Sequence, residues 1–176
     1  MSQETIVEEN PMRAIRVGKV VLNIGVGKSG EAIERGKSVL EQVTGQKPSQ
    51  RRAKKSVREF GVHRGEPIGV LVTVRGDGTT ELISRLLEAR EKKMSESCFD
   101  LRGSVSFGVK EHIEIPGIRY DPTIGIFGMN VSVLLERAGY RVSRRNRRAS
   151  RVGRRQVVSR EESMEFFKHN FGVTIE

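Results

Sequence analysis

Four segments of the chain alternate apolar and polar residues, and this pattern constrains the fold more than any other feature. The segments span residues 19–24, 67–76, 104–110 and 128–136. In the first, Leu22 and Ile24 fall on one side and Asn23 on the other. A period of two is that of a β-strand with one buried face. The four segments therefore predict a sheet with one apolar face and one face of small polar residues.

Helices are expected between and after these strands. Apolar residues at helical spacing predict helices over 31–43 and 79–92. Near the end, Ser159-x-x-Glu162 has the spacing of a capping box and predicts a last helix. Because the apolar face of the sheet must be covered, we expect an α+β fold, with helices packed on one face of a mostly antiparallel sheet.

The length of 176 residues suits one domain. We expect this domain to span 13–176, behind a flexible acidic tail at 1–12. No apolar stretch approaches the roughly 20 residues that span a bilayer, and the N-terminus is acidic where a signal peptide would be basic. These features predict a cytoplasmic protein with no membrane partner. The single Cys98 and three scattered histidines give no disulfide or metal pattern, and we expect no cofactor.

Positive charge is concentrated in two segments. Residues 47–64 have a net charge of +6, and residues 141–160 contain nine arginines and no acid, whereas the whole chain has a net charge of +10. Such local excess is typical of a protein that binds a polyanion such as RNA. We expect 44–64 to be an extended basic loop or hairpin that is mobile until a partner neutralises it, and 141–155 to be a basic hairpin.

Two other functions have some support in the sequence. Gly25-x-Gly27-x-x-Gly30 stands where a dinucleotide-binding enzyme would have its glycines. However, we expect no parallel strand after the helix, and Gln50, Arg51 and Arg52 stand where the ribose-binding acid would. A tight turn explains the glycines better, although Lys28 and the turn's amides could contact an RNA phosphate. The other alternative is a DNA-binding or non-specific basic protein. No residue pattern indicates catalysis.

Base stacking on the sheet is not expected. Sheets that stack RNA bases carry aromatic residues on their open face, and Phe107 falls on the apolar side of its strand. Recognition should then rest on phosphate contacts from Arg and Lys, with hydrogen bonds from Asn, Gln and Thr.

Five strings of the sequence, in order, resemble one known family. They are KVVLNIGVG, TGQKPSQRRAKKSV, EPIGVLVTVRG, FDLRGSVSFGVKEH and IPGIRYDPTIGIFGMN. The resemblance covers about residues 19–136 and is to large-subunit ribosomal protein number five, whose eukaryotic counterpart is numbered eleven. The resemblance implies a non-enzymatic protein of the central protuberance that binds 5S rRNA and attaches it to the large subunit. It also implies contacts with large-subunit rRNA, P-site tRNA, neighbouring large-subunit proteins and the small-subunit head protein number thirteen.

The resemblance also implies site residues. The 5S rRNA contacts fall on Asn23, Gln46 and Thr73, with Lys47 and Arg75 beside them. The family's tRNA-facing loop matches residues 49–62, whose expected tRNA or rRNA contacts are Arg51, Arg52, Lys54, Lys55, Ser56 and Arg58. By charge alone, we expect rRNA contacts from Arg144, Arg145, Arg147, Arg148, Arg151, Arg154 and Arg155.

The chain departs from the bacterial pattern at both ends. Bacterial members begin with an extra helical segment, and here the first strand starts only a few residues from the N-terminus. Residues 137–176 resemble the archaeal and eukaryotic form, so we expect an archaeal-type member. Whether Arg119, Tyr120 and Asp121 form the bridge between subunits stays open.

Overall fold

A five-stranded sheet forms the centre of the computed structural model, which describes residues 10–176 except Lys28 and Tyr120. The strands lie in the order β2-β3-β1-β6-β5, and all neighbours are antiparallel. Their bounds are Ile15–Gly25 (β1), Ser49–Arg52 (β2), Pro67–Val74 (β3), Ser104–Val109 (β5) and Met129–Arg137 (β6). Two short strands, β4 (Lys93–Met94) and β7 (Thr174–Ile175), form a separate parallel pair.

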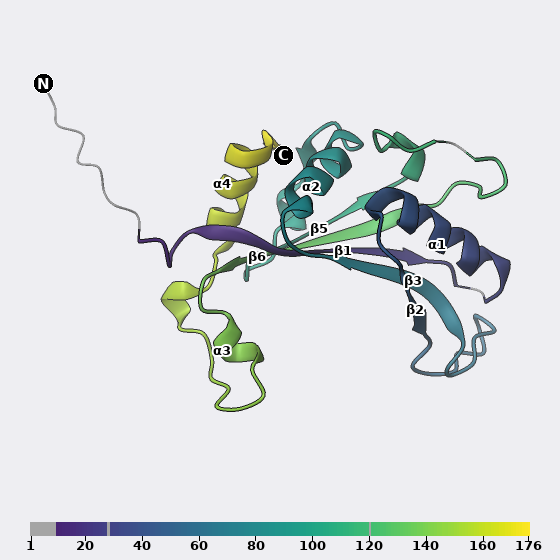
Figure 1. Cartoon of the computed structure of the whole chain (residues 1–176), viewed down its shortest axis with the longest axis horizontal. Coiled ribbons are helices and arrows are strands. Elements are labelled where there is room, and N and C mark those ends of the chain that lie inside the picture. Colours follow the sequence, from purple (N-terminus) through teal and green to yellow (C-terminus); the bar gives the residue numbers. More distant parts are fainter. Residues whose placement is uncertain (1–9, 28, 120) are drawn as a thin grey trace, which may run out of the picture.

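The longer helices lie on one side of this sheet. They are α1 (Glu31–Thr44), α2 (Gly78–Glu88) and α4 (Arg160–Phe171), and the one-turn α3 (Arg141–Arg144) lies on the other side (Figure 1). Short 3-10 helices span Glu96–Cys98, His112–Glu114 and Arg154–Gln156. The predicted α+β class is confirmed. Within the described ranges, no helix combines the length and the apolarity needed to cross a bilayer.

Strand register explains why the core lies under the helices. Val20 pairs with Val74 on one side and Val133 on the other, and all three side chains are buried. Leu22 and its partners repeat this arrangement one step along the strand. Burying each such side chain contributes roughly 1.5–3 kcal/mol. Residues between these positions, including Asn23 and Thr73, point to the opposite face.

Helix α2 is shorter than predicted, since it ends at Glu88 rather than at residue 92. Glu91 and Lys92 adopt left-handed φ angles of 53° and 56°. The Lys92 amide donates to the carbonyl of Leu87, so the chain reverses and buries Met94 in β4. Apolar spacing alone did not indicate this reversal.

Of the loop and the hairpin expected over 44–64, the structure shows a hairpin, which a strand precedes. Residues Ser49–Arg52 form the edge strand β2, paired with β3. Their side chains are all exposed, so the strand is held by backbone pairing that covers the otherwise open edge of β3. Beyond β2, residues 53–66 form a narrow hairpin (the basic hairpin below), in which Val57 pairs with Val62.

The hairpin predicted over 141–155 is wrong. Helix α3 is followed by irregular chain and the 3-10 helix Arg154–Gln156. Tertiary contacts take the place of strand pairing: the Tyr140 hydroxyl donates to the carbonyl of Gln156 (3.2 Å) and accepts from the amide of Val158 (3.1 Å). The Gln156 amide group also donates to the carbonyl of Met12 at 2.7 Å. The capping box of α4 is confirmed, with Ser159 and Glu162 in the predicted roles.

Candidate nucleic-acid interface

The side of the sheet opposite α1, α2 and α4 presents rows of small polar and apolar side chains. We call this surface the open face. One row crosses all five strands and consists of Ser49, Leu71, Asn23, Asn130 and Gly108. The next row consists of Thr73, Val21, Ser132 and Ser106. None of these positions carries a formal charge, so any selectivity of these two rows must come from hydrogen bonds and shape.

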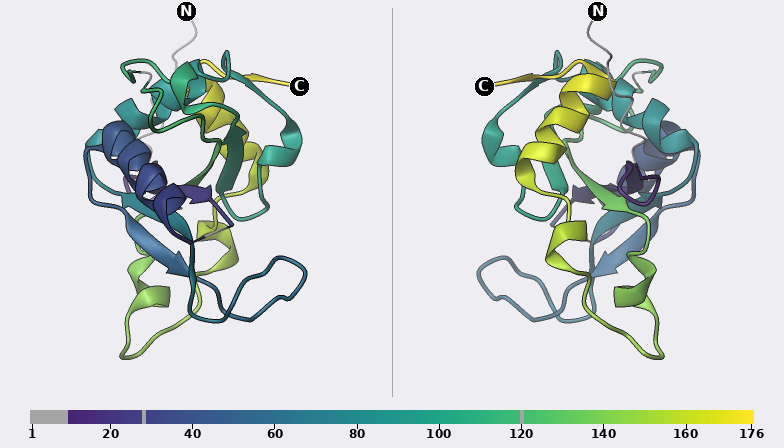
Figure 2. Two further views of the ribbon diagram at one scale, coloured as in Figure 1. Left: turned by 90° about the vertical axis from the view of Figure 1, so that its right-hand side faces the viewer. Right: turned by 90° about the vertical axis from the view of Figure 1, so that its left-hand side faces the viewer.

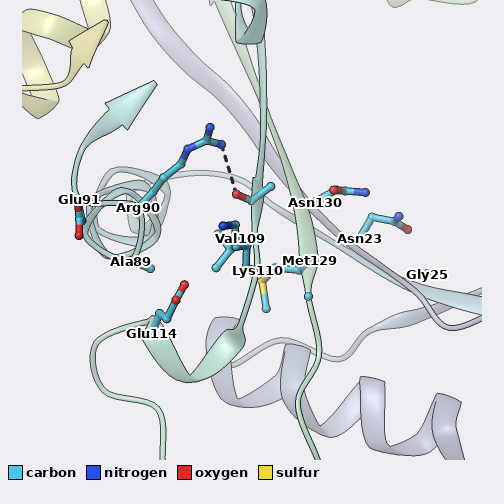
Figure 3. Close-up of a pocket in the computed structure, with 12 residues that line it drawn as sticks. Asn23, Gly25, Ala89, Arg90, Glu91, Val109, Lys110, Glu114, Met129 and Asn130 are labelled. Carbon is cyan, nitrogen blue, oxygen red and sulfur yellow. Dashed lines mark hydrogen bonds between the residues drawn. The ribbon is translucent and has the colours of Figure 1, made fainter. Parts of the chain in front are cut away.

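Asn23 and Asn130 form the centre of the open face. They are register partners on β1 and β6, and Figure 3 shows both side chains on the side of the strands away from α2. Each amide group offers two donors and an acceptor, which suits base edges and ribose hydroxyls. Beside them, the Ser106 hydroxyl donates to that of Ser132 at 3.1 Å.

The structure brings two of the predicted 5S rRNA contacts together. Thr73 lies one row from Asn23 on the adjacent strand, because Val21 is its register partner. Arg75 follows the end of β3 and is exposed. Gln46 and Lys47 are also exposed but lie in the connection from α1 to β2, outside the sheet.

The predicted tRNA and rRNA contacts divide between a strand and a hairpin. Arg51 and Arg52 belong to β2, whereas Lys54, Lys55, Ser56 and Arg58 lie in the basic hairpin, and all six are exposed. The Ser56 hydroxyl accepts a hydrogen bond from the amide of Arg64 at 2.9 Å. Ser56 therefore already stabilises the hairpin.

Glu66 anchors the base of the basic hairpin. Its carboxylate accepts hydrogen bonds from the amide of His63 at 3.0 Å and from the hydroxyl of Ser29. These two bonds hold the pKa of Glu66 below its ordinary value. The anchor is therefore charged at neutral pH, and it ties the hairpin to the turn that precedes α1.

The C-terminal arginines differ in their availability. All seven predicted residues, Arg144, Arg145, Arg147, Arg148, Arg151, Arg154 and Arg155, are exposed. Arg144 forms an ion pair with the mostly buried Glu136, and Arg145 donates to the carbonyl of Arg148 at 2.8 Å. Arg144 therefore has a structural partner.

Both basic segments project from the same side of the molecule as the open face. Figures 1 and 2 show the basic hairpin and the segment 141–157 below the sheet, opposite α1 and α2 and near different ends of the strands. A polyanion lying across this side would meet guanidinium and ammonium groups at its flanks and neutral polar groups in the middle. Phosphate contacts would supply most of the affinity, and the polar rows would supply selectivity.

A small pocket lies at one end of the open face. Strands β1 and β6 pair as far as Asn23 and Asn130, and Gly25 and Gly128 beyond them line the pocket together with Arg90 (Figure 3). The Arg90 guanidinium donates to the carbonyl of Gly108 at 3.3 Å. Its position is therefore fixed at the border between α2 and the sheet.

The glycine-rich turn does not have the geometry of a nucleotide site. The amides of Val26 and Gly27 both donate to the carbonyl of Ile68, at 3.0 and 2.9 Å, so they are not free for a phosphate. The predicted phosphate contact of Lys28 lies outside the described residues. Among the residues that are described, no group of three His, Cys, Asp or Glu side chains could hold a metal ion.

Sequence reasoning missed part of the interface. The alternation puts Asn130, Ser106 and Ser132 on the polar sides of their strands, but they are not among the predicted site residues. Only strand register reveals that Asn130 lies directly beside Asn23. Alternation predicts on which face of the sheet a side chain lies. It does not predict which residue lies beside that side chain on the next strand, because this depends on pairing between distant segments.

Known proteins resemble the chain along nearly its whole length. The family described as Ribosomal protein L5 matches residues 10–63, and the C-terminal part of the same ribosomal family matches residues 67–166. Proteins named large ribosomal subunit protein uL5 are similar to it. That of Pyrobaculum aerophilum is 49% identical over 97% of this chain and 96% of its own. Those of Nitrosopumilus maritimus and Sulfurisphaera tokodaii are 47% and 50% identical, over 99% and 94% of each chain.

Proposed function

The chain belongs to the ribosomal protein L5 family, and from this premise we propose that it binds 5S rRNA and attaches it to the large subunit. It is a structural protein of the large ribosomal subunit and not an enzyme. The observation that carries the proposal is the open face, on which Asn23 and Thr73 lie on adjacent strands, flanked by two basic segments (Figure 2).

The two kinds of surface have different tasks in this proposal. Arginines and lysines of the basic hairpin and of 141–157 attract RNA phosphates and release counterions. Asn23, Thr73 and Gln46 hydrogen-bond to 5S rRNA, with Lys47 and Arg75 nearby. Each hydrogen bond that is buried on binding is worth on the order of 1–3 kcal/mol if its partner is removed. In this proposal the basic residues therefore supply most of the affinity for RNA, and the polar residues supply the selectivity for 5S rRNA.

Further contacts are proposed for the segments beyond the sheet. The basic hairpin carries Lys54, Lys55 and Arg58 on an exposed projection, which suits a second RNA such as P-site tRNA or large-subunit rRNA. The arginines of 141–155 bind rRNA. The bridge to small-subunit head protein number thirteen and the contacts with neighbouring large-subunit proteins rest on the resemblance to the family alone.

Titration of the protein against 5S rRNA at several salt concentrations tests this division. Replacing Arg75 or Arg147 by Gln should make the log-log salt slope shallower by about 0.7–0.9 for each phosphate that is no longer neutralised. Asn23→Ala or Thr73→Val should weaken binding by roughly 5- to 150-fold, which corresponds to about 1–3 kcal/mol, and leave the salt slope unchanged.

Variants on the helix side serve as controls. Arg35→Gln on α1 and Thr80→Val on α2 change the same residue types at exposed positions, and we expect neither to alter affinity. If the open-face variants and the arginine variants changed the salt slope equally, the division of tasks would be wrong. Equal retention of duplex DNA and 5S rRNA would instead indicate a non-specific basic protein.

A further inference from the structure

A groove lies between the turn at 100–103 and the C-terminal basic segment. Its apolar lining is formed by Leu101, Tyr140, Val152 and Val157, and its basic lining by Arg102, Arg151 and Arg154. We propose that this groove binds one unpaired nucleotide of RNA, with the base against the apolar side chains and the phosphate on the arginines. The inference rests on the proposed function as an RNA-binding protein.

The groove combines one strongly exposed leucine with further apolar side chains. Leu101 is 76% exposed, although a single exposed leucine would need no explanation. Here Tyr140, Val152 and Val157 line the same groove. The groove encloses about 840 Å³, which is within the roughly 300–1,000 Å³ of sites for small organic groups. A nucleobase is a flat, largely apolar group that fits such a surface.

One wall of the groove is fixed by a glycine. Gly103 has a φ of +74°, and a Cβ atom there would lie 2.8 Å from Cβ of Val158. Its carbonyl accepts from the amide of Leu135 at 2.9 Å, and the amide of Asp100 donates to Ser104 at 2.8 Å. The turn that carries Leu101 is thus held against the end of β6.

The opposite wall is fixed by Tyr140. Its hydroxyl is satisfied inside the protein by Gln156 and Val158, so its ring remains part of the lining. Because both walls are formed before binding, a nucleotide would enter without the entropic cost of ordering them.

The charge of the groove favours a phosphate-bearing ligand. Its lining contains three arginines and no acidic residue. Among the described residues, the arginines that form ion pairs are Arg16, Arg137, Arg144 and Arg160, and none of these three is among them. A guanidinium group can bind a phosphate through two hydrogen bonds and can stack on a base. An acidic peptide would share only the ionic part of this chemistry.

The groove lies next to the start of strand β5. The turn of Leu101 and Arg102 leads directly into β5, whose first residue, Ser104, is the register partner of Leu134 on the open face. An RNA that crosses the open face can therefore place a looped-out nucleotide in the groove without leaving the protein surface.

Two RNA hairpins that differ by a single bulged adenosine test the proposal with the full-length protein. In fluorescence anisotropy at fixed salt, the bulged hairpin should bind about tenfold more tightly, as expected when one base packs against protein side chains. Leu101→Asn and Val152→Asn should abolish this preference without weakening binding to the paired hairpin. The control Ile126→Asn, at an apolar position that is 57% exposed elsewhere, should retain it.

The outcomes separate this inference from the proposed function. Equal affinity of the unmodified protein for the two hairpins would overturn the groove and leave 5S rRNA binding intact, whereas no binding to 5S rRNA would overturn both. Unchanged affinity for the paired hairpin shows that the variants are folded.

Crosslinking with 4-thiouridine at the bulge gives a second test. Crosslinks to Leu101 or to 140–157 support the proposal, and crosslinks confined to the basic hairpin contradict it. If a polyglutamate peptide abolished the preference for the bulged hairpin, the groove would recognise negative charge alone. That result would contradict the proposal.

Discussion

At the scale of single residues, Gly103 combines two constraints that no other amino acid satisfies. Its φ of +74° is unfavourable for an L side chain, and a Cβ atom would clash with Val158. Gly103→Ala should therefore lower the free energy of unfolding by about 1–3 kcal/mol. Urea denaturation measures this loss. Gly153→Ala is the matched control, because Gly153 has a φ of −61° and open space around it, and a similar loss there would contradict the explanation.

His112 should make stability depend on pH near neutrality. The side chain is 1% exposed, and its Nδ1 atom accepts from the amide of Phe127 at 3.3 Å. Burial lowers the pKa of His112 below 6.5. Below pH 6.5 the unfolded chain therefore binds a proton that the folded chain does not, and stability falls as the pH falls.

The expected slope below neutrality is at most about 1.4 kcal/mol per pH unit, the limit for one proton. Urea midpoints measured between neutral and mildly acidic pH test it. His112→Asn should flatten the dependence even if it lowers overall stability, whereas His169→Asn, at an exposed position, should leave it unchanged. If the slope persisted in His112→Asn, another group would be responsible.

How much of the site could be predicted depends on the residue. Alternation was sufficient to place Asn23 and Thr73 on the open face. It could not show that Asn130 lies beside Asn23, because that depends on which strands pair. It also could not show that the hydroxyl of Ser56 accepts a hydrogen bond from Arg64, since this contact depends on the path of the hairpin.

At the scale of elements, the capping box of α4 is linked to the sheet by an ion pair. Glu162 caps the helix, and its carboxylate also forms an ion pair with the guanidinium of Arg137 at 2.8 Å. The Arg137 side chain is only 9% exposed. Ser159→Ala should cost about 1 kcal/mol, as typical for an N-cap. Glu162→Ala should cost about 1.5–3 kcal/mol more, because a hydrogen bond between charged groups is also lost. Thermal or urea unfolding measures both, and equal losses would argue against a role for the ion pair.

The Glu162 carboxylate should also make the stability of the protein depend on pH in the acid range. Burial alone would raise the pKa of Glu162, but the Ser159 amide and Arg137 outweigh it and hold the pKa below 4.5. The stability it contributes is therefore present above pH 4.5 and is lost as the pH falls through the lower, folded value. Glu162→Gln should remove this part of the acid transition, and an unchanged acid profile would contradict it.

The strands that sequence failed to predict lack a local signal. All four residues of β2 are exposed, so no alternation marks it, and the strand exists because β3 offers an unpaired edge. Strand β1 begins at Ile15, earlier than predicted. The prediction missed its first residues because a bulge between Val17 and Lys19 interrupts the alternation. The segment 141–157 is shaped by Tyr140 and Gln156 through contacts that are distant in the sequence, which periodicity cannot reveal.

At the scale of the whole molecule, charge is separated between the two sides of the sheet. Each of the helices α1, α2 and α4 contains one more acidic than basic residue. The opposite side carries the basic hairpin and the arginines of 141–157 (Figure 2). This separation should orient the protein so that the open face meets the RNA and the helices face away.

Lysine acylation with and without bound large-subunit rRNA tests this orientation. Lys54 and Lys55 lie on the exposed basic hairpin, whereas Lys168 is exposed on α4. An amine that contacts phosphate is shielded from reagent, so acylation of Lys54 and Lys55 should fall several-fold in the complex. Mass spectrometry should detect no change at Lys168, which serves as the internal control. Equal protection of Lys168 and Lys54 would show that RNA associates without a preferred face.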